Sequence, residues 1–514
     1  MTHWIVAPVI LPAMMAPFIV LAARYHIGIQ RVFSIASVLA LIGIAIGLSW
    51  EASRGTVLLY QLGDWAAPFG IVLVGDRLST MMVLLTAVLA LFVLLYAIGS
   101  AWDERGRHFH ALFQFQLMGI TGAFLTGDLF NLFVFFEVLL IASYGLMIHS
   151  GGNTRLRAGV QYVLFNLIGS TLFLFALGAI YAQTGTLNMA DVAQRMSLIN
   201  MDDTVGIRLA AVLLLLVFAI KAALVPLHFW LPSSYAEAPA PVAALFAIMT
   251  KVGAYAIIRV YTMVFPPDAA VTSGLHTSWL LPAALVSLSV GMVGVLGARR
   301  LDRLVTFSVI GSMGMVMTSI ALFTPEGIAA SMYYIVHSTL AAAALFLIVD
   351  LVQTGRLHLT FNALPPASGA ILTSGLFFIA AIAMTGLPPL SGFIGKLLIL
   401  DAGFESPIAS WIWAVILVSS LISVVGFARA GSVIFWKAKS VEPAEGWHPG
   451  VTPAPLSYFA VGGLITLLVA HTVFAGSTYG YAERTSAQLF EPQPYIATVL
   501  ETPGKLSKPL EEAR

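Results

Sequence analysis

The sequence predicts an all-α polytopic membrane protein of about fourteen transmembrane helices, with two inverted five-helix repeats and two broken helices. Three observations predict this fold: the composition, the recurrence of apolar stretches, and prolines inside two of those stretches. The 514-residue chain is 59% hydrophobic and 10% charged, whereas a soluble domain carries about 25% charged residues. The deficit of charge extends along the whole chain, so one anchor on a soluble body does not explain it.

Apolar stretches long enough to cross a hydrocarbon core of about 30 Å recur from Trp4 to the residues around 470. The connections between them are short, which excludes an inserted soluble domain. The predicted spans are 4–22, 31–49, 76–99, 110–127, 129–149, 160–182, 206–231, 239–264, 277–298, 303–323, 326–353, 371–402, 409–437 and 456–474.

Three segments outside the spans carry further expectations. The first apolar stretch lacks a basic leader and a small-residue cleavage pattern, so we expect a retained helix. The mixed segment 50–75 can form a small hairpin outside the membrane. The tail after Ala475 contains several prolines, and we expect it to be irregular or disordered.

Basic residues in the short connections predict the orientation. The odd connections hold twelve arginines and lysines and the even connections hold five, so the odd connections should be cytoplasmic and both termini should lie outside. The twelve are Arg24, Arg31, Arg105, Arg107, Arg155, Arg157, Arg299, Arg300, Arg303, Arg356, Lys437 and Lys439; the five are Arg54, Arg77, Arg195, Arg208 and Arg259.

Several classes of site are absent from the sequence. The chain has no cysteine, which excludes thiolate metal sites, iron–sulfur clusters and disulfides. It has no phosphate-binding loop and no dinucleotide-binding motif, so nucleotide-driven pumping within this chain is not expected. A net charge of +1 argues against nucleic acid as a partner.

Five ionisable residues lie near the middle of five different spans: Glu137, Lys221, Lys251, His337 and Lys396. Each charge at a helix centre costs about 2.5–3.5 kcal/mol on insertion scales. A purely structural interpretation is a Glu–Lys pair that locks two helices together. One glutamate cannot neutralise three lysines, however, and burial opposes the charged form of such groups. The pattern therefore favours a line of groups that exchange protons across the membrane.

Prolines interrupt two of these spans beside a lysine. Pro226 follows Lys221 by five residues and cannot donate to the carbonyl of Ala222. Pro388 and Pro389 lie between Gly386 and Lys396. We expect both spans to be broken there, because irregular backbone at membrane depth occurs where it is buried in protein or lines a wet cavity. An ordinary proline kink is the alternative, and the lysine beside each break favours an ion path.

Other polar residues near the first break are weaker candidates. His228, between Pro226 and Pro232, is a secondary candidate for the path. Asn166, Ser170 and Thr171 in the sixth span can hydrate such a path, although such residues more often bond across helices as packing contacts.

The two broken spans are the seventh and the twelfth, five apart. Repeats of five spans must have opposite orientations, as in many transporters. We therefore expect three helices in 1–109, a first repeat in 110–264, a second in 277–437, and a last helix with the irregular tail in 438–514. The halves are not simple copies, because Lys221 precedes its proline and Lys396 follows its own.

Four stretches together carry a resemblance to a known family. They are residues 135–137 (FFE), 221–239 (KAALVPLHFWLPSSYAEAP), 249–253 (MTKVG) and 386–393 (GLPPLSGF). They resemble the antiporter-like subunits shared by respiratory complex I, membrane-bound hydrogenases and Mrp-type sodium/proton antiporters, over roughly residues 60–440. Within that family the chain is most similar to the D subunits of multisubunit Mrp (Mnh or Pha) antiporters.

The resemblance implies a role for each buried charge. Glu137 and Lys221 match the glutamate–lysine pair of the first half-channel, and Lys251 matches the bridging lysine. His337 matches the histidine of the eleventh span, and Lys396 the terminal lysine of the second half-channel. It also implies a subunit of a hetero-oligomer in the bacterial cytoplasmic membrane that exchanges protons with Na⁺ or K⁺ and has no cofactor and no metal of its own.

Three functions remain open at this point. The first is proton translocation by a subunit of a monovalent cation/proton antiporter. The second is a proton-pumping subunit of a complex I-like or hydrogenase complex, related to NADH:quinone oxidoreductase. The third is a scaffold that transports nothing, whose buried charges only hold helices together. None of the three makes this chain an enzyme by itself.

Overall fold

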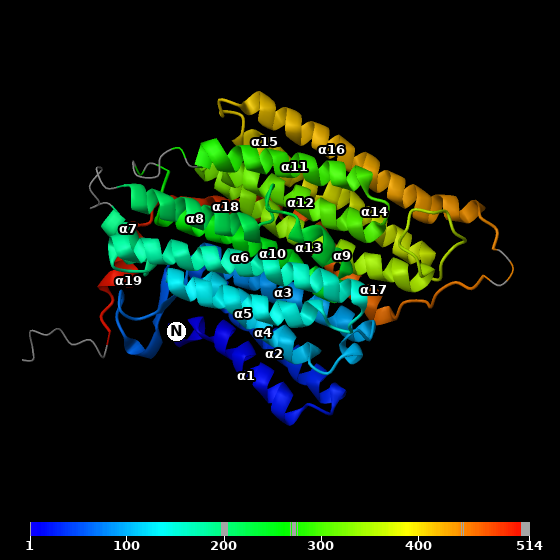
Figure 1. Cartoon of the computed structure of the whole chain (residues 1–514), viewed down its shortest axis with the longest axis horizontal. Coiled ribbons are helices and arrows are strands. Elements are labelled where there is room, and N and C mark those ends of the chain that lie inside the picture. Colours follow the sequence, from blue (N-terminus) through cyan, green and yellow to red (C-terminus); the bar gives the residue numbers. More distant parts are fainter. Residues whose placement is uncertain are drawn as a thin grey trace, which may run out of the picture.

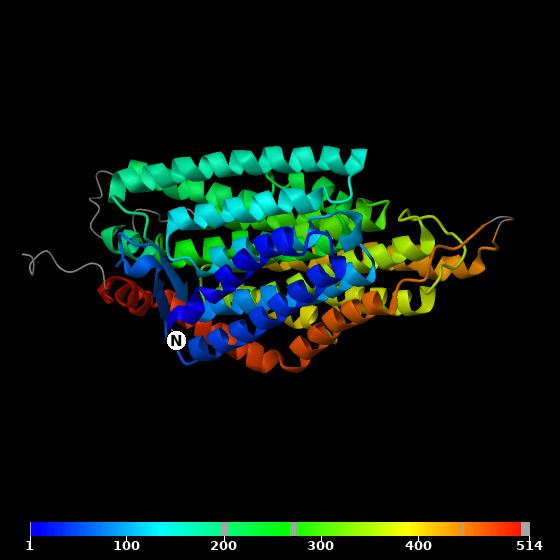
Figure 2. The ribbon, with the colours of Figure 1, turned by 90° about the horizontal axis from the view of Figure 1, so that it is seen from below.

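The computed structural model describes residues 2–196, 204–267, 269, 274, 276–443, 445 and 447–504. Its long helices run side by side along one direction, and their connections gather at the two ends of the bundle (Figures 1 and 2). Ten of the described helices are long and apolar enough to cross a membrane. The predicted helical membrane fold is therefore confirmed.

Each stretch predicted as a span contains a helix, because lipid-exposed backbone must satisfy its hydrogen bonds internally. The helices are α1 (Ala7–Ala22), α2 (Ile27–Ser53), α3 (Arg77–Gly99), α4 (Phe109–Leu125), α5 (Leu129–Met147), α6 (Asn153–Thr184), α7 (Met189–Met196), α8 (Val205–Lys221), α9 (Trp230–Glu237), α10 (Ala240–Met263), α11 (Leu281–Gly297), α12 (Leu301–Ile320), α13 (Pro325–Arg356), α14 (Ala370–Thr385), α15 (Ser391–Ala402), α16 (Ala409–Gly431), α17 (Pro455–Val473), α18 (Ala475–Phe490) and α19 (Gln493–Glu501).

The segment 50–75 contains the expected hairpin. Strands β1 (Leu58–Gln61) and β2 (Val72–Gly75) pair antiparallel, with Leu58 opposite Gly75. The hairpin lies at the same end of the bundle as the N-terminus and α19 (Figure 1).

Two helices form the centre of the bundle. The apolar window of α10 is 100% buried and that of α13 is 94% buried, whereas the window of α2 is 33% buried. Figure 1 shows α2 at one side of the molecule and α16 at the other, with α10 and α13 between them. Lys251 and His337 are therefore carried by the helices that the rest of the bundle encloses most completely.

The prediction of an irregular tail is wrong for residues 475–501. α18 buries Ala482, Thr485, Ser486 and Leu489, and the Ser486 hydroxyl donates to the Pro325 carbonyl at the start of α13. Of the prolines that suggested disorder, Pro494 lies in the first turn of α19, where a missing N–H costs nothing. The expectation for residues 505–514 lies outside the described residues.

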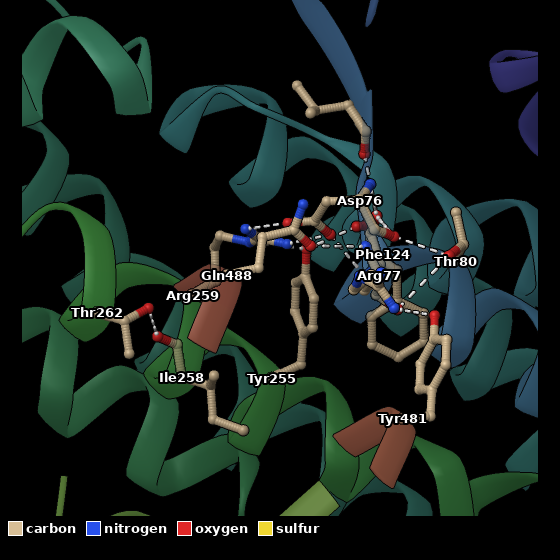
Figure 3. Close-up of polar contacts among 12 residues, drawn as sticks. Asp76, Arg77, Thr80, Phe124, Tyr255, Ile258, Arg259, Thr262, Tyr481 and Gln488 are labelled. Carbon is tan, nitrogen blue, oxygen red and sulfur yellow. Dashed lines mark hydrogen bonds and ion pairs between the residues drawn. The ribbon is translucent and has the colours of Figure 1, made fainter. Parts of the chain in front are cut away.

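A buried ion pair connects these C-terminal helices to the hairpin end of the bundle (Figure 3). Asp76, which caps α3, binds Arg259 of α10 through two nitrogen–oxygen contacts of 2.6 and 2.7 Å. The guanidinium of Arg259 lies 5.4 Å from the ring centroid of Tyr495 in α19. Tyr481 of α18 donates to the Arg77 carbonyl at 2.9 Å. The hairpin, α3, α10, α18 and α19 are thus joined at one polar cluster.

This cluster predicts the effect of Asp76→Asn. The substitution leaves the Arg259 charge buried without its partner, and breaking such a pair costs about 3–5 kcal/mol. We expect unfolding of the purified protein in detergent at a lower temperature, with earlier proteolysis of α18 and α19. Asp64→Asn, at an exposed position near the hairpin, is the matched control; equal stability of the two variants would contradict the assignment.

Candidate functional site

The first break separates α8 from α9. α8 ends at Lys221 and α9 begins at Trp230, so that Pro226 lies in the non-helical segment between them. The freed groups find other partners: the Trp230 indole donates to the Ile220 carbonyl at 3.0 Å, and the Val225 N–H donates to the Ser287 hydroxyl at 2.8 Å. The buried His228 also lies in this segment, and among the described residues it makes no hydrogen bond to any of the five charged residues.

Glu137 and Lys221 are joined through α6. The Lys221 ammonium donates to the side-chain oxygen of Asn166 at 3.0 Å, and the Ser170 hydroxyl donates to the Glu137 carboxylate. Asn166 and Ser170 are four residues apart and therefore share one face of α6. No direct ion pair forms between Glu137 and Lys221 among the described residues, although the two interact electrostatically. The ammonium also lies 5.6 Å from the Phe136 ring centroid.

Lys251 of α10 lies on the helix that packs against the end of α8. Gly253, two residues farther along α10, packs so closely on α8 that a Cβ atom there would lie 3.1 Å from the Lys221 carbonyl carbon. Two residues span about 3 Å along a helix axis, so Lys221 and Lys251 lie at the same depth on adjacent helices. Lys251 is 0% exposed, and no protein group in the described chain accepts a hydrogen bond from its ammonium.

The second break supplies a hydrogen-bond acceptor to Lys396. α14 ends at Thr385 and α15 begins at Ser391. In a continuous helix the Thr385 carbonyl would accept from residue 389, but Pro389 has no N–H. The Lys396 ammonium donates to this freed carbonyl at 2.6 Å and to the Ser420 hydroxyl of α16 at 2.8 Å. Gly386 is required beside it: its φ is +73°, and a Cβ atom there would lie 2.6 Å from the Lys396 side chain.

His337 connects the centre of the bundle to this second break. Its Nδ1 lies 2.9 Å from the hydroxyl of Ser391, the first residue of α15. Its Nε2 has no hydrogen-bond partner within the described part of the chain. His337 interacts electrostatically with both Lys251 and Lys396. The structure therefore brings the five residues into one sequence of neighbours: Glu137, Lys221, Lys251, His337 and Lys396.

Sequence reasoning missed His471, which faces His337 from α17. Its ring stacks on Tyr333 with centroids 4.2 Å apart, and it interacts electrostatically with His337. Its only signal in the sequence is a lone histidine within the apolar stretch 456–474. The sequence also understates Asn166 and Ser170, because spacing alone does not show that they contact Lys221 and Glu137.

The partners of the buried cations determine what this arrangement can do. Lys221 and Lys396 donate to an amide, a carbonyl and a hydroxyl, all neutral acceptors. A lysine held by neutral dipoles can gain or lose its proton without leaving a buried carboxylate unpaired. In the described chain no three histidine, aspartate or glutamate side chains are placed to hold a metal ion. The geometry therefore suits proton transfer between neighbours.

Comparisons with known proteins agree with this geometry. The family model described as NADH:quinone oxidoreductase/Mrp antiporter, TM, matches residues 126–423. A relative from Rhizobium meliloti (strain 1021), named as the D subunit of a probable K(+)/H(+) antiporter, is 36% identical over 98% of this chain and 98% of its own length. A relative from Bacillus subtilis (strain 168), named as the D subunit of a Na(+)/H(+) antiporter, is 37% identical over 97% of this chain and 100% of its own.

A solved structure shows the same fold over nearly the whole chain. A chain in the structure of the Mrp complex from Dietzia sp. DQ12-45-1b superposes with a TM-score of 0.87 at 26% sequence identity. The match covers 97% of this chain and 100% of that one. The likeness therefore extends well beyond the residues that the family model matches.

The α6 bridge predicts the effect of Asn166→Leu. The variant leaves the Lys221 ammonium without its acceptor, and hydrogen bonds to charged groups contribute about 1.5–3 kcal/mol. We expect a loss of thermal stability of that order in detergent, and recovery of most of it when Lys221→Met is added. Thr171→Val, at an exposed position on the same helix, should change stability little. An Asn166→Leu variant as stable as this control would contradict the bridge.

Proposed function

Because the chain belongs to the NADH:quinone oxidoreductase/Mrp antiporter family, we propose that it is the proton-translocating D subunit of a multisubunit monovalent cation/proton antiporter. The observation that carries the proposal is the line of protonatable residues that runs from the half-buried Glu137 through the buried Lys221, Lys251 and His337 to the buried Lys396. The relatives named as antiporter D subunits match over nearly their whole lengths, which supports this subtype. The chain acts as a secondary transporter subunit and not as an enzyme.

The relay divides into two halves that meet at the centre. Glu137 and Lys221 exchange protons in the first half, with Asn166 and Ser170 as the neutral links between them. Lys251 and His337 pass the charge through the two central helices. Lys396 is the terminal group, and the freed Thr385 carbonyl and the Ser420 hydroxyl hold its ammonium when it is charged.

The electrostatics of the line couple its members. A charge that arrives on His337 raises the free energy of a charge on Lys251 or Lys396, because like charges in a low-dielectric interior repel strongly. Proton loss from one lysine is therefore favoured when its neighbour gains a proton. The membrane potential adds about 2.3 kcal/mol per charge for each 100 mV.

The architecture that goes with this function has fourteen spans. α4, α5, α6, α8 with α9, and α10 form the first repeat, 110–264; α11, α12, α13, α14 with α15, and α16 form the second, 277–437. Three helices in 1–109 precede them, and α17 in 438–514 is the last span. The arginine-rich connections face the cytoplasm, so that both termini lie outside a bacterial cytoplasmic membrane.

The chain works together with other subunits of a hetero-oligomeric antiporter. The name of one relative specifies K⁺ and that of another Na⁺, and the exchanged ion is one of these two. Support for an assembly comes from the solved Mrp complex that contains a chain of this fold.

The first half of the relay is tested by Glu137→Ala and Lys221→Ala. Each variant removes one proton-carrying group, and positioned proton-transfer groups contribute about 10²–10⁴-fold to rate. We expect cation/proton exchange in everted vesicles to fall by about 10²-fold or more while the complex still assembles. Wild-type exchange from both variants would rule out the relay and favour the scaffold alternative.

The last group is tested by Lys396→Arg. Arginine keeps the charge but does not deprotonate in proteins, so exchange should be lost although the charge and the assembly remain. Lys439→Arg, at an exposed position, is the matched control and should exchange at the wild-type rate. Wild-type exchange from Lys396→Arg would show that Lys396 is an electrostatic anchor and not a proton carrier.

A further inference from the structure

A polar cavity of about 350 Å³ opens at the end of the bundle that carries the arginine-rich connections. It lies between the two repeats, where α9 meets α10 and where the last turns of α13 pass the short turn Asp103–Arg105. This end is at the right in Figure 1. The charged residues that line the cavity are Arg105, Arg155, Arg300, Glu237, Asp302 and Asp350.

Most of these charges are already engaged at the wall. Arg300 pairs with Asp302 at 2.5 Å, and Glu237 pairs with Arg303 at 3.3 Å. Arg155 donates to the Glu237 carbonyl at 2.8 Å. The two ion pairs balance in charge, whereas Arg155 donates to a neutral backbone carbonyl and keeps its positive charge. Arg105 lies over the Trp102 ring, 3.8 Å from its centroid, and interacts electrostatically with Asp350.

Asp350 differs from the other acidic residues of the lining. Its side chain is only 6% exposed, and it forms no ion pair within the described ranges. One carboxyl oxygen, Oδ2, accepts from the Tyr96 hydroxyl at 2.8 Å and from the Trp102 indole at 3.1 Å. No described protein group donates to the other oxygen. Asp350 is thus held in a fixed orientation with one oxygen left for another donor.

The inner end of the cavity lies on the two helices that carry Lys251 and His337. Ala243 of α10 and Phe346 of α13 lie in its lining, eight residues from Lys251 and nine from His337. At 1.5 Å per residue these separations are about 12 and 14 Å along the helix axes. Small side chains, Ala247 on α10 and residues 341–344 (AAAA) on α13, lie along this distance. Four or five hydrogen-bond lengths of about 2.8 Å cover it.

We propose that Asp350 is the proton-exchanging carboxylate of a cytoplasmic vestibule, connecting bulk water to Lys251 and His337. The inference rests on the proposed function and its orientation. The carboxylate takes a proton from vestibule water, and then releases it through water toward a neutral Lys251 or His337, which becomes charged as the carboxylate is restored. The reverse order carries a proton from the relay to the cytoplasm. Tyr96 and Trp102 are positioning residues, because they hold Oδ2 and leave the second oxygen free.

The direct test is Asp350→Asn in the assembled antiporter complex, in everted vesicles. Asparagine keeps an oxygen that can accept from Tyr96 and Trp102 but cannot carry a proton, so exchange should fall at least tenfold with assembly unchanged. Asp350→Glu, which restores a carboxylate, should recover a large part of the rate. Gln353→Ala, which alters the same cavity without removing a titratable group, should exchange like wild type.

Wild-type exchange from Asp350→Asn would overturn the proposal. Loss of exchange from Tyr96→Phe in the same assay would then indicate a purely structural role for the cluster. Glu137→Ala still tests the relay itself, so failure of the vestibule is distinguished from failure of the proposed function. If the wild-type complex exchanges no protons, the proposed function and the vestibule proposal are both wrong.

A labelling experiment tests the vestibule even if Asp350→Asn does not assemble. The chain contains no cysteine, so a membrane-impermeant charged thiosulfonate will react only at an introduced thiol of this chain. Gln353→Cys should be labelled in everted vesicles and protected in right-side-out vesicles. Ala342→Cys, fully buried on the same helix, should not be labelled in either. Labelling of Gln353→Cys only from the outside would overturn the orientation and with it the proposal.

Discussion

The cost of burying cations in an apolar interior is the constraint on which the rest of this structure depends. Three lysines at membrane depth cannot all be neutralised by Glu137, and an unpaired buried charge is among the most destabilising features a protein can contain. For Lys221 and Lys396 the fold meets this constraint with neutral dipoles in place of counter-ions, whereas the Lys251 ammonium has no such partner among the described residues. An amide holds Lys221, and a carbonyl and a hydroxyl hold Lys396. An ammonium group held in this way can gain or lose its proton while its side chain stays in the same position.

Lys221 and Lys396 obtain their neutral hydrogen-bond acceptors in different ways. In the second half Pro389 frees the Thr385 carbonyl, and the lysine that follows the break folds back to use it. In the first half the lysine precedes the break, so its partner comes from α6, while the groups freed near Pro226 are taken by Trp230 and Ser287. The opposite order of lysine and proline in the two halves thus has a direct structural consequence. Between them, α10 and α13 bury Lys251 and His337 more deeply than any lipid-facing helix could.

The sequence was sufficient for features that depend on one helix at a time. Helices follow from the apolar stretches, and the two breaks follow from proline chemistry. Contacts between side chains of different helices could not be predicted from the sequence. Asn166, Ser170, His471 and Asp350 have ordinary local sequences, and only tertiary packing shows what they face. The helices of the tail escape prediction for a related reason. α18 docks on α13 and α19 docks on the Asp76–Arg259 pair, and neither contact is visible in the local sequence.

The central claim is that the charges form one connected relay and not two independent sites. The most direct measurement is a double-mutant cycle on the exchange rate of reconstituted complexes, with Glu137→Asp at one end and Lys396→His at the other, so that both ends keep a protonatable group. Steps in series add their delays, so the account predicts that the double variant is much less impaired than the product of the single effects, with a coupling of about 1 kcal/mol or more. Effects that add to within about 0.5 kcal/mol, as distant independent sites do, would contradict it.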